Sequence, residues 1–227
     1  PVIDWIVATD DRYLTQAPGC DKIAVYDIKN PNRSILDGGY AVSPAHLTAT
    51  SDGTVIVGNF LYGPRAIHVL TNRARVDHLW RPVFLAGDLD WAAAILITRD
   101  DQTLILPYIT GLGKQPISDV YTSVGGDEMN HPGKLPPPTN RIIGIRPAAM
   151  VDSLDAKTLY VAGADAKLYR VDLESFRVVM PPLDYQGTVG STGLRVTRTY
   201  MSISPDGRFL IINGGSRPEM TVVDLTT

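Results

Sequence analysis

An aspartate-led turn followed by an apolar run recurs five times along the chain, and this repeat constrains the fold more than any other feature. The turn aspartates are Asp10, Asp52, Asp100, Asp155 and Asp206, which lie 42, 48, 55 and 51 residues apart. Self-similarity at a spacing of roughly 40 to 50 residues is typical of four-stranded propeller blades. The repeat therefore predicts an all-β chain with about five visible four-stranded blades.

Each copy divides into a strand, the aspartate turn, a second strand, a loop and a third strand. An aspartate in such a turn accepts a hydrogen bond from the backbone two residues on. The second strands are short apolar runs at 55–57, 104–106, 159–161 and 210–212. Runs of this kind are typical of strands covered on both faces, and no stretch keeps a helical period for the roughly 11 residues that a helix prediction requires.

The composition agrees with a compact domain. Of the 227 residues, 44% are hydrophobic and 20% are charged, so the chain can bury a sizeable core. We expect one propeller domain over residues 1–227. Whether the ring contains more than five blades is left open at this point. The net charge of −3 argues against a nucleic-acid surface. The sequence also lacks the long apolar run that a membrane span needs, and nothing in it calls for a cofactor.

The third copy is longer than the others. The strand expected to follow its aspartate turn, at 141–145, comes later than in the other copies, which predicts a long loop insertion at about 107–140. Long loops are usually functional or disordered, so we expect this one to contact a partner protein. Its Asp127, Glu128 and His131 offer oxygen and imidazole ligands, but their spacing matches no established metal motif. A solvated loop tip is the alternative, and any metal stays unknown.

The last copy carries a family resemblance. Residues 202–215, followed by 220–225, resemble the repeat of YVTN-type β-propellers. The same repeat style is similar to that of lactonase-like propellers and of the heavy subunit of methylamine dehydrogenase. The resemblance implies a propeller fold and an extracytoplasmic location, periplasmic or secreted. It implies no catalytic residue that can be transferred to this chain.

The number of blades allows two arrangements. Five copies form either a five-bladed ring that closes in an unusual way, or part of a ring of about six to eight blades. We expect the second. Open edge strands invite association, which is why propeller rings close.

Propeller geometry predicts where a ligand would bind, on the rim opposite the aspartate turns. His46 is expected near the start of an inner strand, facing the channel, although a hydrogen-bonded structural histidine is the alternative. Asp88 and Asp90 lie on one side of a strand by period-2 alternation and are candidates for cation binding or acid–base chemistry, with solvated turn carboxylates as the ordinary alternative. Arg198 near Tyr200 is a candidate for anion binding, with surface ion pairing as its alternative.

Two classes of function follow from these observations. The first, which we favour, is a non-catalytic binding or scaffold protein that uses the channel rim and the insertion to bind another protein in an extracytoplasmic assembly. The alternative is a propeller enzyme, either a lactonase-like hydrolase or an oxidoreductase subunit, with its site at the channel mouth. Propellers include both binding proteins and enzymes, so the fold does not decide between the two classes. A small-molecule ligand is compatible with either class.

Overall fold

The structure is a computed structural model of the whole chain. It describes residues 5–8, 12–16, 22–27, 30–39, 44–51, 55–60, 66–71, 81–85, 94–124, 133–138, 140–185, 199–214 and 220–226. Side chains are described for 48–51, 94–120, 135–138, 140–185, 199–213 and 220–226. The turn aspartates Asp10 and Asp52 lie outside these ranges.

Five mainly antiparallel sheets follow one another in chain order, as the repeat predicts. The first sheet contains β1 (Trp5–Ala8), β2 (Arg12–Gln16), β3 (Lys22–Asp27) and β4 (Asn30–Gly39). The second contains β5 (Pro44–Ala49), β6 (Val55–Phe60), β7 (Ala66–Thr71) and β8 (Arg81–Leu85), with β12 (Gly133–Leu135) added beside β8. The third contains β9 (Leu96–Ile97), β10 (Thr103–Tyr108), β11 (Gly111–Pro116) and β13 (Asn140–Ile143).

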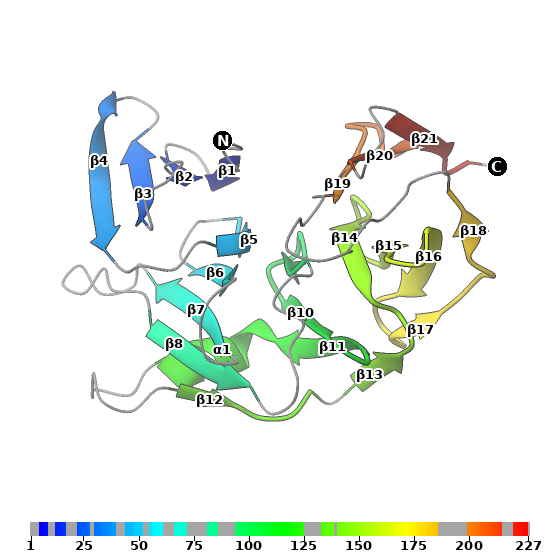
Figure 1. Ribbon diagram of the computed structural model, residues 1–227, viewed down its shortest axis with the longest axis horizontal. Coiled ribbons are helices and arrows are strands. Elements are labelled where there is room, and N and C mark those ends of the chain that lie inside the picture. Colours follow the sequence, from blue (N-terminus) through cyan, green and yellow to red (C-terminus); the bar gives the residue numbers. More distant parts are fainter. Residues whose placement is uncertain are drawn as a thin grey trace.

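The fourth sheet contains β14 (Pro147–Asp152), β15 (Thr158–Gly163), β16 (Lys167–Asp172) and β17 (Arg177–Val178), and β18 (Leu183–Asp184) also pairs with β16. The fifth contains β19 (Thr199–Ile203), β20 (Phe209–Gly214) and β21 (Met220–Asp224). Figure 1 shows the five sheets placed in order around a common centre, with the first and fifth sheets at its two upper sides. The first strands of neighbouring sheets contact each other, β1 with β5, β5 with β9 and β14 with β19.

The core lies between successive sheets. The cluster between the third and fourth sheets includes Ile105 and Leu112 on one side and Leu159, Val161 and Val171 on the other. A second cluster joins the fourth and fifth sheets. The apolar runs predicted as second strands form β6, β10, β15 and β20. β10 and β15 have no polar alternation because each is covered on both faces by neighbouring sheets.

The insertion in the third copy begins later than the sequence predicts. Residues 107–116 are not loop, because β10 and β11 form a tight hairpin and β11 is the third strand of this sheet. Residues 140–143 form the outer strand β13 rather than the third strand. The close pairing of β11 and β13 requires glycine at Gly111, since a Cβ there would collide with the carbonyl oxygen of Ile142.

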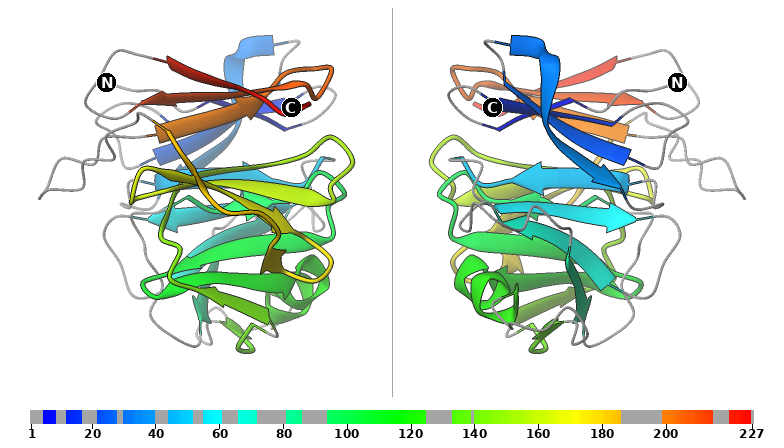
Figure 2. Two further views of the ribbon diagram at one scale, coloured as in Figure 1. Left: turned by 90° about the vertical axis from the view of Figure 1, so that its right-hand side faces the viewer. Right: turned by 90° about the vertical axis from the view of Figure 1, so that its left-hand side faces the viewer.

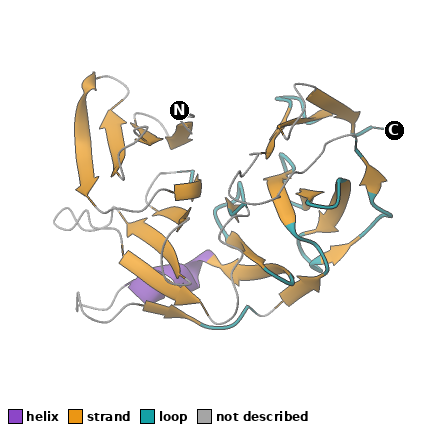
Figure 3. Ribbon diagram, in the orientation of Figure 1, coloured by secondary structure: helices purple, strands orange, loops and turns teal. Residues whose placement is uncertain are grey.

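The inserted segment between β11 and β13 contains a helix that the sequence analysis does not predict. This helix, α1 (Ile117–Val124), has only eight residues, too few to show a helical period over a longer window. It contacts β7 and β8 of the second sheet, and Figure 3 shows it in purple. Beyond it, β12 pairs with β8 in parallel. The described part of the insertion therefore packs onto the neighbouring sheet, and we call α1 and β12 together the strap.

Candidate functional site

The aspartate turns repeat the same hydrogen bonds in three sheets. In the fourth sheet the Ser153 hydroxyl donates to Asp155 Oδ1 (2.5 Å), and the Lys157 N–H donates to the same oxygen (3.2 Å). The Thr158 N–H in turn donates to Ser153 Oγ (3.0 Å). The turns led by Thr98 and Ser204 form the same set of bonds. The described turn aspartates thus have structural partners of their own.

These bonds also determine how the carboxyls titrate. Hydrogen bonds from the Ser153 hydroxyl and the Lys157 N–H lower the pKa of Asp155. Hydrogen bonds from the Ser204 hydroxyl and the Arg208 N–H lower that of Asp206 in the same way. Both side chains therefore stay ionised at neutral pH. Their oxygens bind the turn itself, and no group of three or more metal-ligating side chains occurs among the described residues.

Neighbouring turns are joined to each other. The Ser51 N–H and hydroxyl both donate to the Asp101 carboxylate, with the N–H at 2.7 Å from Oδ1. The Arg99 N–H donates to Asp152 Oδ2 at 2.6 Å, and its side-chain Nε lies 3.5 Å from Asp152 Oδ1. Burial raises the pKa of the Asp152 carboxyl, against the opposing effect of the Arg99 hydrogen bond. We call the face of the propeller that carries the aspartate turns the turn face. Hydrogen bonds on this face thus join the second sheet to the third and the third sheet to the fourth.

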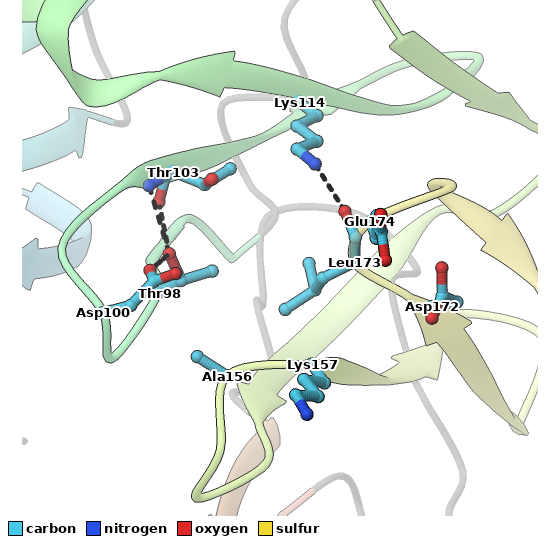
Figure 4. A pocket seen from close by; sticks show the side chains of 9 residues that line it. All are labelled: Thr98, Asp100, Thr103, Lys114, Ala156, Lys157, Asp172, Leu173 and Glu174. Atoms are coloured by element: carbon cyan, nitrogen blue, oxygen red, sulfur yellow. Dashed lines mark hydrogen bonds between the residues drawn. The ribbon is translucent and has the colours of Figure 1, made fainter.

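A cavity of about 250 Å³ opens between the third and fourth sheets on this turn face. Figure 4 shows the side chains that line it, which are Thr98, Asp100, Thr103, Lys114, Ala156, Lys157, Asp172, Leu173 and Glu174. The cavity lies below the usual size of small-molecule sites, which is roughly 300–1,000 Å³. It also lies on the face opposite to the rim where the sequence analysis expects binding.

Two charged side chains of the cavity, Lys114 and Asp172, already have partners in the fold. The Lys114 ammonium donates to the Leu173 carbonyl and so ties β11 to the turn that follows β16. The Ser175 hydroxyl and N–H donate to Asp172 Oδ1 at 2.6 and 2.7 Å and lower its pKa. No sequence pattern described above predicts a role for Lys114. The structure places it in a strand, as a brace between two sheets.

The structure describes few of the predicted site residues. His46 lies in β5, the inner strand of the second sheet, opposite Asn59, and its side chain is not among those described. Tyr200 lies in β19, opposite Asn213, and is 43% exposed. Outside the described residues lie Asp88, Asp90, Arg198, Asp127, Glu128 and His131. The proposed roles of these residues are therefore untested and stay predictions.

One apolar surface stands out on the outer side of the fourth sheet, and no sequence pattern predicts it. We call it the blade-4 edge; it consists of the exposed side chains Val178, Val179, Met180 and Leu183. They belong to β17, β18 and the segment between these two outermost strands. Figure 2 (left) shows these strands on the outside of the molecule. Edge strands and exposed apolar patches are the features by which proteins bind other chains.

Comparison with known proteins identifies the fold. No family model matches the chain, and no curated protein matches it. Among solved structures, hydrazine synthase from Kuenenia stuttgartiensis is similar, with a TM-score of 0.62 and 13% identity over 90% of this chain and 52% of that one. The β-propeller domain of Cps50 (Swd1) from Myceliophteria thermophila is similar with a TM-score of 0.55 and 11% identity, over 90% of this chain and 58% of that one. The chain spans little more than half of each, and it is an all-β propeller.

Proposed function

We propose that this propeller is a non-catalytic binding protein that captures an extended apolar segment of a partner protein along the blade-4 edge. The observation that carries the proposal is the exposure of four apolar side chains within residues 178–183, of which Val179 is 50% and Leu183 54% exposed. A polar edge would be expected if the surface only faced water, because exposed apolar edges promote association.

The strap shows that this fold accepts such an addition. At the outer edge of the second sheet, β12 extends the sheet as a fifth strand, parallel to β8. Leu135 of β12 is fully buried there. Strand addition of this kind obtains affinity from main-chain hydrogen bonds and specificity from side-chain contacts. By the same geometry, a partner segment would lie beside β17 and β18.

The finer parts of the function belong to this proposal. We propose that the protein is of the YVTN type and acts in an extracytoplasmic assembly, as the repeat in its last copy implies. The rim and the insertion tip, with Asp127, Glu128 and His131, are proposed as further contacts. Among the described residues, no helix is long and apolar enough to cross a membrane.

Affinity capture from source cells tests the proposal with three baits: the parent chain, Leu183→Asp and Ile109→Asp. Ile109 is a matched control, since it is 60% exposed but lies in the turn between β10 and β11. Proteins held by the parent and by Ile109→Asp, but lost with Leu183→Asp, are then purified and titrated against the three baits. We expect at least a tenfold weaker Kd for Leu183→Asp, about 1.4 kcal/mol. Equal affinity for all three baits would remove the blade-4 edge from the interface, and failure to capture any protein would contradict the binding function.

A further inference from the structure

The fifth sheet has one face packed on the fourth sheet and one face open. Strand alternation and register place Leu210 and Ile212 of β20 toward the fourth sheet, where both are buried. The opposite face, which we call the blade-5 outer face, carries Tyr200, Ser202, Ile211, Asn213, Met220 and Val222. Of these, Met220 is 58% and Val222 54% exposed.

Five of these six positions are buried in the fourth sheet, and what buries them is the next sheet. The sixth, Val222, corresponds to Arg170, which is exposed. Counting from the turn residues Ser153 and Ser204, and following the register, five positions of the two sheets correspond. In the fourth sheet they are Ala149, Val151, Tyr160, Ala162 and Leu168, and in the fifth they are Tyr200, Ser202, Ile211, Asn213 and Met220. The five in the fourth sheet are buried in one cluster with Leu210 and Ile212 of the fifth. In the fourth sheet, the surface equivalent to the blade-5 outer face is thus covered by the next sheet.

Among the residues of this face that the structure describes, no unpaired charge opposes an apolar cover. Its strands carry two described ionic groups at the turn end, where Arg208 Nη2 and Asp224 Oδ2 lie 2.9 Å apart. The Arg208 guanidinium also lies over the Phe209 ring, 4.8 Å from its centroid. The pair neutralises itself, so a covering sheet needs aliphatic side chains and no compensating charge.

We propose that a sixth β-blade packs on the blade-5 outer face, in the way that the fifth blade packs on the fourth. The contacting side chains of this blade would be aliphatic, at the positions that Leu210 and Ile212 occupy in the fifth. The proposal is independent of the blade-4 edge, which lies on the outer strands of another sheet.

Thiol labelling tests the proposal. A reporter thiol is introduced as Met220→Cys into the full chain with Cys20→Ser, because the equivalent Leu168 of the fourth sheet is buried, and Val179→Cys gives a control of similar exposure, 50% against 58%. The probe for the sixth blade is a second copy of residues 186–227 fused after Thr227, which presents Leu210 and Ile212 once more. Because Tyr200 and Asn213 replace the alanines of the fourth sheet, a second fusion carries Tyr200→Ala and Asn213→Ala in the receiving sheet.

We expect labelling of Met220→Cys to slow by about tenfold or more in at least one fusion, because the thiol then reacts only after local opening. The control thiol of Val179→Cys should keep its rate. Unchanged labelling in both fusions, with circular dichroism showing folded protein, would overturn the proposal. Concentration-dependent protection of Met220→Cys in the unfused chain would overturn it as well, since a second copy would then be the occupant.

Discussion

At the scale of single residues, one turn geometry is kept while its sequence varies. The fourth residue of each described turn has a positive φ, 58° at Asp101, 54° at Ala156 and 73° at Gly207. Glycine adopts this conformation without cost and aspartate with little, whereas alanine pays roughly 1–2 kcal/mol. The hydrogen bonds of the turn aspartate and of the hydroxyl residue two positions before it hold the geometry even at Ala156.

Gly207→Ala should therefore destabilise the protein. The alanine would have to adopt a left-handed backbone conformation, and its Cβ would lie 3.1 Å from Leu154 Cδ1 in the neighbouring turn. We expect the free energy of unfolding to fall by about 1–2 kcal/mol, measured by urea denaturation. Ala156→Gly is the reverse change at the equivalent position. It should leave stability equal or higher, and a loss like that of Gly207→Ala would contradict the turn argument.

The pair Arg208–Asp224 should make stability depend on pH. Hydrogen bonds from the Arg208 guanidinium and from Thr226 lower the pKa of Asp224 to about 2. This pKa lies below that of an aspartate in the unfolded chain, about 3.9. The ionised carboxylate therefore stabilises the fold fully above about pH 3.9, and this stabilisation is lost as the pH falls toward 2. Arg208→Ala should lower Tm slightly at neutral pH, because exposed pairs are weak. Thermal unfolding over a pH series should show the difference vanish in acid, and a constant difference would refute the assignment.

At the scale of elements, the strap explains how one blade edge is closed. The parallel pairing of β12 with β8 covers the outer strand of the second sheet using residues of the third repeat. Val120 of α1 and Leu135 of β12 are both fully buried. The insertion thus adds a further contact between the second and third sheets, beyond the packing of their adjacent faces.

Leu135→Ala should weaken the protein by removing this buried contact. A leucine-to-alanine change in a core costs about 2–5 kcal/mol, depending on how far the site collapses. We expect a loss in that range by urea denaturation. Pro137→Ala, at an exposed position two residues later, is the control and should change stability by no more than about 0.5 kcal/mol. Similar losses in both variants would mean that the strap is not what holds this edge.

The elements also show which sequence patterns are informative. Runs such as Leu104–Leu106 were predicted as strands because their apolar continuity is a local property of a doubly covered strand. Two errors arose in the third repeat. The strand β11 was missed because its sequence, with two glycines and a lysine, lacks an apolar pattern, and α1 was missed because it is short. Both are held by contacts with neighbouring strands rather than by local propensity.

At the scale of the whole molecule, stability should decrease from the inner strands to the outer edge. The second strands β10 and β15 lie between neighbouring sheets, and Leu104, Ile105, Leu159 and Val161 are fully buried. The outer strands β17 and β18 have two residues each and are exposed. Backbone amides exchange according to the free energy of opening, which is highest in the core.

Hydrogen exchange should follow this gradient. We expect amides of β10 and β15 to exchange at least about a hundredfold more slowly than those of β17 and β18, measured by mass spectrometry on the purified chain. A bound partner segment along the blade-4 edge would raise protection in β17 and β18 alone. Uniform exchange across the fourth sheet of the unbound chain would contradict the gradient.

The sequence by itself determined the repeat, its turns and the apolar runs of its second strands, since each of these is set within a few residues of the chain. Ser153 and Asp155, for instance, bond across two positions, and the same pattern recurs wherever the turn recurs. Only the tertiary structure decided that the insertion packs on the second sheet, that Lys114 braces two sheets and that the blade-5 outer face is open. These features join residues far apart in the chain, and no local pattern records which distant surfaces meet.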